Sequence, residues 1–350
     1  MKLGSPSLRG LLLLAMGCGV TPLSLGEEPP APIERARRAG VFTLHFENDF
    51  FGGQDRHYTN GLKLSWLSSD LTTWDLRSWR RRFAETLPFL NRPDAQKNLG
   101  FAFGQNIYVP QDISRVPPAP TDRPYAGWSY LEFSLVSKNE RRMDIFSVQV
   151  GIVGRHSYAQ DLQVIVHEWL NDEHPDGWDY QLHDEGGVNL IYERKWRLYD
   201  RSFNHRLGFD FVPTIGVSLG NIQTFASAGA EGRLGFNLPS DFGINLINGV
   251  PASHTPVDDR DPRLSLRKGG IFIFGGGVGR AVAHDIFLDG NTFRDSPSVD
   301  KKPFVADTFY GLGVVWDRWQ LTYTEVLRTR EFVGQHRKNY FGSITLSRTY

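Results

Sequence analysis

Two residues near the middle of the chain could do acid–base chemistry. His167 and Gln163 are four positions apart in an amphipathic segment, residues 158–171, so their side chains share one helical face. A neutral imidazole can take a proton from water near neutral pH, which makes His167 a candidate general base. The ordinary alternative is that His167 is a polar residue on a surface helix. A zinc-protease motif is excluded because Asn171 and His174 do not supply the second histidine at the required spacing.

A second group of polar residues could hold a metal ion. Asp49 follows Asn48 at the end of an alternating segment, and Thr59 lies further along the same connection. Hard cations such as calcium are held by carboxylate, amide and carbonyl oxygens, so Asp49 is the candidate metal ligand. Asn48 and Asp49 could equally form a turn cap at the end of a strand. Thr59 could simply be the residue that starts the next strand.

The elements that must position these residues are β-strands, because apolar and polar residues alternate from Gly40 onward. In residues 206–219, one face is apolar and the other is mostly small or polar. Such segments are long enough to cross a bilayer as tilted strands of roughly 9–11 residues. An outer-membrane barrel turns its apolar face to lipid and fills its interior with polar groups, whereas a soluble sandwich does the reverse. The polar side chains predicted to fill the interior include Glu193, Lys195, Arg197 and Asp210.

The composition supports an all-β fold. The chain contains 24 Phe, 12 Tyr, 9 Trp, 36 Gly and 20 Pro, which are strand and turn formers. It has no apolar run of about 18 residues or more, which excludes a helical membrane protein. Lys and Arg number 39 and so do Asp and Glu, so nothing suggests a nucleic-acid partner.

The first residues predict export. A basic start is followed by an apolar stretch, residues 11–20, and by small residues within 24–26, which predicts cleavage after Gly26. The single cysteine, Cys18, lies inside this segment, so the mature chain would have no thiol. Lipidation at Cys18 is the alternative, although residues 15–17 lack the leucine that a lipoprotein box has three positions upstream.

We therefore predict a twelve-stranded antiparallel transmembrane β-barrel, with a short helix in an extracellular loop, in the outer membrane of a Gram-negative bacterium. The chain divides into a signal peptide (1–26), a linker (27–40) and the barrel (41–350). The terminal aromatic Tyr350 is typical of such barrels, whereas Arg348 on the same face is not. The predicted strands are residues 41–49, 61–68, 98–107, 127–137, 142–153, 187–198, 205–219, 222–237, 269–282, 304–317, 319–328 and 338–350.

The order of the strands predicts where the polar groups meet. In an up-and-down barrel, all connections after odd-numbered strands lie at one rim, and here this rim would face outward. Asn48 and Asp49 follow the first strand, and the helix with His167 follows the fifth. We therefore predict that His167 lies close to Asn48, Asp49 and Thr59, facing a groove on the side wall or rim.

The motifs together resemble the LpxR-type lipid A 3'-O-deacylase family. The resemblance covers most of residues 41–350 and implies a twelve-stranded outer-membrane barrel that removes the acyloxyacyl chain from the 3' position of lipid A, with calcium dependence. The matching strings are Glu47-Asn48-Asp49, Asp55-Arg56-His57-Tyr58-Thr59-Asn60-Gly61, Asp122-Arg123-Pro124-Tyr125-Ala126-Gly127, Gln163 with His167, and Gly177-Trp178-Asp179-Tyr180-Gln181.

Carried over by position, the resemblance assigns roles to five residues. His167 is similar to the base that activates water, with Gln163 as its neighbour on the helix. Asn48, Asp49 and Thr59 match members of the active site, with Asp49 on the metal side.

The loop after the third strand departs from the family, where a lysine is used. Here the loop has Arg115 and Arg123, which cannot act as neutral bases and bind anions differently, so they are candidates for substrate binding. The implied partners are lipid A or lipopolysaccharide and other outer-membrane lipids, and we expect a monomer. Two rival functions stay open: a non-catalytic porin or scaffold, and a barrel phospholipase acting on glycerophospholipids.

Overall fold

The computed structural model describes most of the chain. The predicted signal peptide lies outside the described residues, and so does the side chain of Thr59. The described residues are 32–49, 57–71, 86–87, 89–170, 174–203, 206–244, 246–247, 255–265 and 268–350.

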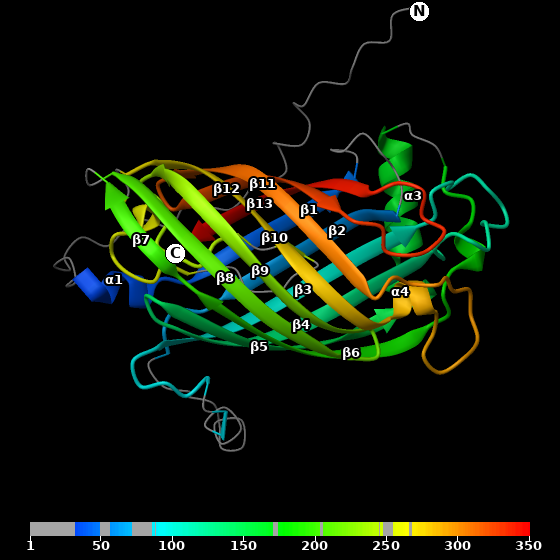
Figure 1. Ribbon diagram of the computed structural model, residues 1–350, viewed down its shortest axis with the longest axis horizontal. Coiled ribbons are helices and arrows are strands. Elements are labelled where there is room, and N and C mark those ends of the chain that lie inside the picture. Colours follow the sequence, from blue (N-terminus) through cyan, green and yellow to red (C-terminus); the bar gives the residue numbers. More distant parts are fainter. Residues whose placement is uncertain are drawn as a thin grey trace, which may run out of the picture. The chain divides into compact units, whose positions relative to one another are not determined.

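Antiparallel strands form a closed barrel (Figure 1), in which each strand pairs with its neighbours in the sequence. Pairing of β1 with β13 and of β6 with β8 closes the sheet. The strands are β1 (Val41–Asn48), β2 (His57–Leu67), β3 (Gln96–Val109), β4 (Ala126–Lys138), β5 (Arg142–Val153), β6 (Glu185–Trp196), β7 (Leu198–Phe203), β8 (Leu207–Gly220), β9 (Gln223–Phe236), β10 (Gly270–Asp285), β11 (Phe304–Trp316), β12 (Trp319–Arg328) and β13 (Asn339–Thr349).

The thirteen labelled strands make a twelve-stranded barrel. β7 continues β6 after an interruption at Arg197, because Lys195 pairs with Thr214 and Leu198 pairs with Phe211 on the same neighbour, β8. The predicted fold class and strand number are therefore confirmed.

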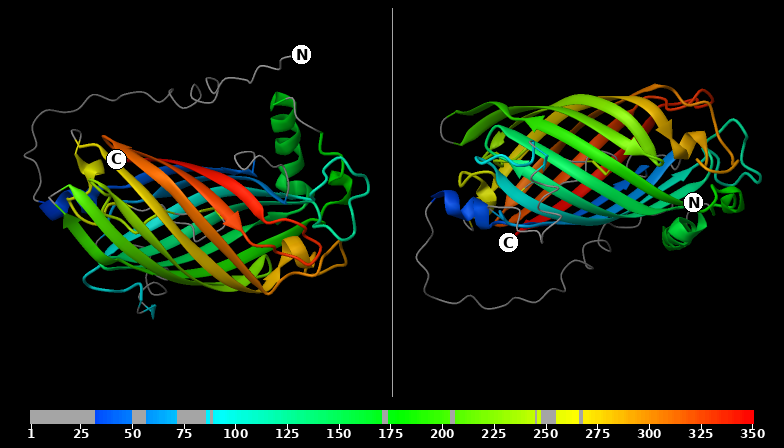
Figure 2. Two further views of the ribbon diagram at one scale, coloured as in Figure 1. Left: turned by 45° about the horizontal axis from the view of Figure 1, so that its top comes forward. Right: turned by 90° about the horizontal axis from the view of Figure 1, so that it is seen from below.

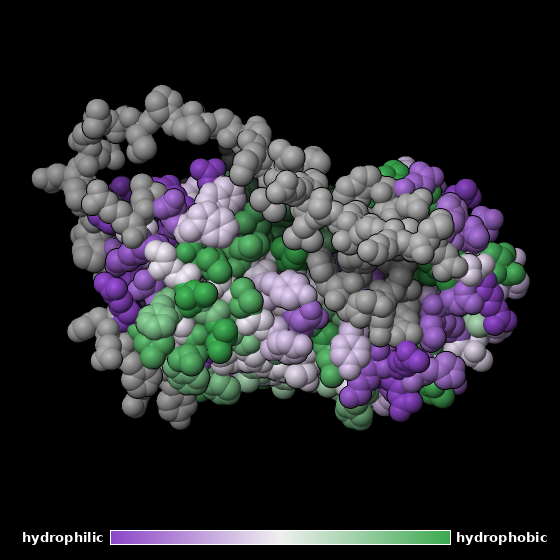
Figure 3. All heavy atoms as spheres, turned by 90° about the horizontal axis from the view of Figure 1, so that it is seen from above, coloured by the Kyte–Doolittle hydropathy of each residue, from purple (hydrophilic) through white to green (hydrophobic). Residues whose placement is uncertain are grey.

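Alternation along the strands separates a lipid face from a filled interior, as the sequence predicts. Figure 3 shows hydrophobic residues along the wall and hydrophilic residues towards both ends. Glu193, Lys195, Arg197 and Asp210 are all buried, which confirms the predicted polar interior. The exposed apolar side chains include Phe42, Leu44, Leu64, Phe101, Phe103, Leu131, Val150, Leu190, Ile215, Val217, Leu219, Leu234, Ile271, Ile273 and Leu312.

The connection between β9 and β10 enters the barrel and adds to this filling. Ile247 in this connection donates its backbone N–H to Glu47 Oε1 over 2.7 Å, which ties it to the far end of β1. Nearer its start, Arg233 of β9 binds Asp241 over 2.5 Å and also pairs with Asp210. The sequence indicated only a long connection here, and the sole helical turn described in it is η5 (Pro262–Leu264).

The connections after β1, β3, β5, β8, β10 and β12 share one end of the barrel, which we call the loop rim. It carries η3 (Arg155–Ser157), α3 (Ala159–Leu170), η4 (Trp178–Tyr180) and α4 (Ile286–Asp289), and α1 (Pro32–Arg38) is at the opposite rim (Figure 1). α3 confirms the predicted helix. Within the described part of the chain, no helix has the length and apolarity needed to cross a membrane.

Candidate functional site on the outer wall

Four outward-facing positions form a row across the barrel wall at the loop rim. Asn48 of β1 pairs with Asn60 of β2, Asn60 pairs with Ile107 of β3, and Ile107 pairs with Gly127 of β4. Directly paired residues point to the same side of a sheet. Asn48 alternates in phase with the exposed Phe42, so the whole row faces outward.

The helix α3 lies on the outer wall over the β3 and β4 part of this row. A Cβ atom placed on Gly127 would come within 2.2 Å of the Cβ of Ala159 and 2.1 Å of Ser157 Oγ. Glycine is therefore required at position 127 for the start of α3 to sit this close to the strand. Gln105 and Ser129, also on the outer wall, both donate to the carbonyl of Ser157, over 2.6 and 2.7 Å, and hold the chain there.

α3 stands at the loop-rim end of the barrel. It starts over β4, contacts β3 as well, and stands beside the loop-rim ends of the first strands in Figure 1 and in both views of Figure 2. From Ala159 to His167 the helix rises about 12 Å. The closeness of His167 to Asn48 and Asp49 stays a prediction.

His167 is held in a hydrogen-bonded chain of three residues. Trp178 Nε1 donates to Gln163 Oε1 over 2.8 Å, and Gln163 Nε2 is 3.4 Å from His167 Nε2. All three side chains are buried. Because Trp178 can only donate, it turns the amide oxygen of Gln163 to itself and the amide NH₂ to the imidazole. The amide NH₂ of Gln163 is then the group beside His167 Nε2, and their separation of 3.4 Å is long for a hydrogen bond.

The segment that follows α3 is tied down near its end. Asp184 accepts hydrogen bonds from the backbone N–H and from Nδ1 of His156, over 2.9 and 2.6 Å. Partial burial raises the pKa of Asp184, but the hydrogen bonds from His156 outweigh it and hold that pKa below its ordinary value. The carboxylate thus stays charged at neutral pH and anchors this connection to η3.

The ends of β1 and β2 are braced from inside the barrel. Glu47 accepts a hydrogen bond from the Tyr58 hydroxyl over 2.9 Å, and both side chains are fully buried. Between Tyr58 and Asn60 the pairing with β3 shifts by one residue, so Thr59 is the extra residue of a β-bulge. A bulge lets Tyr58 face the lumen while Asn60, two residues on, belongs to the outward row. The sequence predicted that β2 starts at residue 61, and the bulge accounts for its earlier start.

The oxygen atoms near this end of the row fit a hard cation. Asp49 is 1% exposed, and Asn60 is 6% exposed with its Oδ1 buried and without a hydrogen-bond partner. A buried amide oxygen without a donor is costly unless a ligand completes it, and calcium prefers such oxygens. No group of three or more His, Cys, Asp or Glu side chains converges among the described residues, so amide and carbonyl oxygens would have to supply most of the ligands.

The sequence matches a known family. Residues 12–350 match the family described as outer membrane protein LpxR. The chain belongs to the LpxR family. The structure of LpxR from Salmonella typhimurium is similar over 88% of this chain and 99% of that chain, with 18% sequence identity and a TM-score of 0.69. This LpxR-family chain is therefore an outer-membrane β-barrel.

Other solved structures are less similar. The KdgM porin covers 89% of this chain and 99% of its own, at 7% identity and a TM-score of 0.35. The β domain of the Bordetella autotransporter BrkA covers 89% and 97%, at 8% identity and a TM-score of 0.39. A search of curated proteins finds no match to the chain.

The two arginines of the β3–β4 connection differ in this LpxR-family barrel. Arg115 is exposed. Arg123 is fully buried, where its Nη1 lies 3.4 Å from Glu331 Oε2 and its guanidinium lies over the Tyr108 ring. A substrate on the outer surface can therefore contact Arg115. Arg123 is not accessible to it, because this side chain is buried against Glu331 and Tyr108.

Sequence reasoning missed three residues that build this site. Trp178 orients Gln163, Asn60 completes the outward row, and Gly127 admits the helix. All three lie inside the strings that carry the family resemblance, but their roles depend on contacts and on strand register. The alternation could have placed Asn60 outward if the bulge at Thr59 had been recognised.

Proposed function

We propose that this chain hydrolyses the acyloxyacyl ester at the 3' position of lipid A, with His167 as the general base. Membership of the LpxR family supports lipid A deacylation. The observation that supports the site most is the buried hydrogen-bonded chain from Trp178 to Gln163 and His167, the last two of which lie on a helix fixed to the outer wall. A lipid in the membrane can approach an outer wall sideways, whereas it cannot enter the lumen.

The proposed reaction transfers one proton through His167. The lone pair on the imidazole takes a proton from water, and the resulting hydroxide attacks the ester carbonyl carbon. The bond between the acyl carbon and the sugar oxygen then breaks, and the imidazolium returns the proton to that oxygen. Gln163 lies beside the ring during both transfers and limits its rotation. The products are a free fatty acid and a lipid A hydroxyl.

Calcium is the proposed cofactor. Asp49 and the unpartnered amide oxygen of Asn60 would hold it, and when bound it would polarise the ester carbonyl. Asn48 and Thr59, from the two strand ends beside them, are proposed to hydrogen-bond the substrate. The exposed Arg115 is proposed to bind a lipid A phosphate, for which a guanidinium offers paired donors.

The filled lumen speaks against the rival function of a porin. Two cavities near Tyr108 in the described part of the lumen measure about 20 and 30 Å³, enough for single water molecules. A sugar or a peptide could not pass through such spaces.

The test is the mass spectrum of lipid A and phospholipids after incubation with purified protein and calcium. We expect loss of the 3' acyloxyacyl chain with the wild type and no product with His167→Ala, since loss of a general base lowers a rate roughly 10²–10⁴-fold. His174→Ala is the matched control, because His174 is exposed and lies on the same connection. Lysophospholipids with intact lipid A would favour the phospholipase instead, and unchanged lipids would favour a scaffold.

A further inference from the structure

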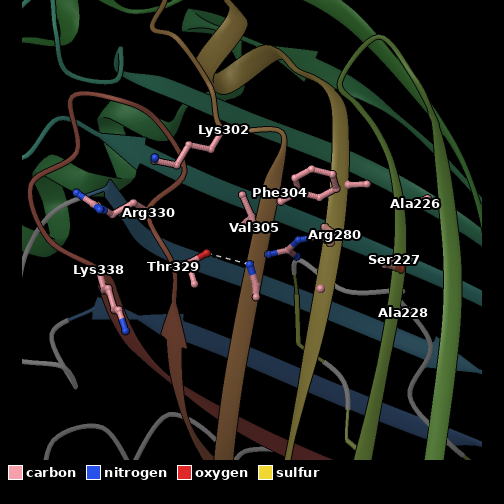
Figure 4. A pocket seen from close by; sticks show the side chains of 13 residues that line it. Ala226, Ser227, Ala228, Arg280, Lys302, Phe304, Val305, Thr329, Arg330 and Lys338 are labelled. Carbon is pink, nitrogen blue, oxygen red and sulfur yellow. Dashed lines mark hydrogen bonds between the residues drawn. The ribbon is translucent and has the colours of Figure 1, made fainter.

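A groove of about 740 Å³ lies at the loop rim on a different part of the barrel from α3. It is lined by β9, β10 and β11 and by the connections before β11 and after β12 (Figure 4). Six strand steps separate β10 from β3 through the β1–β13 pair, so the groove faces away from the candidate active site.

Small residues make the hollow. Alanine and glycine stand at most of the outward positions of the three strands near the loop rim, and a Cβ atom placed on Gly279 would have no atom nearer than 3.9 Å. Towards the opposite rim, the same strands carry large exposed residues such as Leu234, Ile273 and Leu312. The wall is therefore recessed in one half only. The small outward residues lining the groove are Ala226, Ala228, Gly279, Ala281 and Ala306.

Three basic side chains border the recess. Lys302 comes from the β10–β11 connection, and Arg330 and Lys338 come from the β12–β13 connection; Figure 4 shows them on the side of the groove away from Ala226 and Ala228. None of the three forms an ion pair with a described carboxylate. Inside the wall, by contrast, Arg280 is paired with Asp307 over 2.7 Å. The surface thus presents uncompensated positive charge directly above an apolar hollow.

We propose that this groove binds lipid A as a second site, with a phosphate against the three cations and an acyl chain in the recess. The chemistry fits because lipid A joins phosphate groups to several acyl chains, and because a recess in the lipid-facing wall takes a chain sideways. The level fits because five of the six connections at the loop rim have eight or more residues, whereas three of the five at the opposite rim are tight turns. The longer connections of an outer-membrane barrel are extracellular, which sets the loop rim in the lipopolysaccharide leaflet. Phe304, 75% exposed, borders the groove at the depth where the head group would end. This inference does not depend on deacylation at the α3 wall.

The charge is tested by binding of phosphorylated lipid A to the full chain in detergent, followed by native mass spectrometry. We compare Arg330→Gln/Lys338→Gln with Arg294→Gln/Arg337→Gln, which removes the same charge from exposed residues of the β10–β11 and β12–β13 connections outside the groove. Affinity for one bound lipid A should fall roughly tenfold in the first variant only. Dephosphorylated lipid A should bind both variants equally.

The shape is tested with Gly279→Leu, which fills the recess, against Gly232→Leu, which adds the same side chain at an outward position of β9 outside the groove. Gly279→Leu should remove the same bound lipid A, and Gly232→Leu should keep it. Equal lipid A binding by wild type and both groove variants would overturn the proposal. So would an equal loss of phosphatidylglycerol, because the groove would then be a general anionic-lipid surface.

Discussion

Two parts of the same rim differ in how their outward residues are used. On the β1–β4 wall, Gly127 and Ile107 are covered by α3, and the side chains of His167, Gln163 and Asn60 are buried. On the β9–β11 wall, no described helix covers the outward alanine and glycine residues, and basic side chains lie at the edge of the groove. One wall fixes its functional groups by burial, and the other exposes them.

This difference matches two kinds of task. A general base must be held within a fraction of an ångström, and its supporting hydrogen bonds are strongest when water is excluded. An anion that must arrive from a membrane is better met by exposed cations over a hollow, since both can adapt to it. We therefore interpret the first wall as a place for chemistry and the second as a place for binding.

The sharpest way to break the comparison is to force a side chain under α3. Gly127→Leu would push Ser157 and Ala159 off the wall and displace His167, so deacylation should fall about 10³-fold, as for loss of the base. The control is Gly232→Leu, the same change on the other wall, outside the groove. If Gly127→Leu leaves the rate of deacylation within about threefold of wild type, the contact between α3 and the wall does not serve the chemistry.

The comparison also assumes a filled barrel that keeps the two walls in place. Arg233→Leu would leave Asp210 and Asp241 buried with one cation fewer, so the free energy of unfolding should fall by about 3 kcal/mol. Urea unfolding in detergent measures this, with the exposed Arg318→Leu as control. Equal stability of the two variants would show that the segment inside the barrel contributes little.

A smaller effect sharpens the role assigned to buried hydrogen bonds on the first wall. Trp178→Phe keeps an aromatic ring but removes the donor to Gln163, so the amide is free to turn its oxygen towards His167. We expect kcat to fall about tenfold with KM unchanged, since about 1 kcal/mol of orientation is lost. A change in KM alone would instead indicate a packing role for Trp178.

The barrel was predictable because alternation is a local property of the sequence. The strand number and the sharing of one rim by Asn48, Asp49 and the helix with His167 followed from it. The segment that enters the barrel was not predictable, because Ile247 meets Glu47 across 200 residues and carries no periodic pattern. Nothing in the sequence distinguishes Arg115 from Arg123, yet Arg123 is buried beside Glu331.

The sequence predicted the main residues of the candidate site, but not the residues that hold them in position. His167 and Gln163 could be paired from helical spacing alone, whereas the donor to Gln163 comes from Trp178 after a turn of the chain. Asn60 could not be assigned to the outer face, because the bulge at Thr59 reverses the alternation. Support of this kind depends on register and tertiary contact rather than on residue type.

The most direct test of the account is the rate at which purified protein releases the 3' acyloxyacyl chain from lipid A in calcium-containing buffer. The account predicts no release by His167→Ala, full release by His174→Ala, and unchanged binding of lipid A at the β9–β11 groove in both. Release by His167→Ala at the wild-type rate would contradict it, because no other described residue on the α3 wall is proposed to activate water.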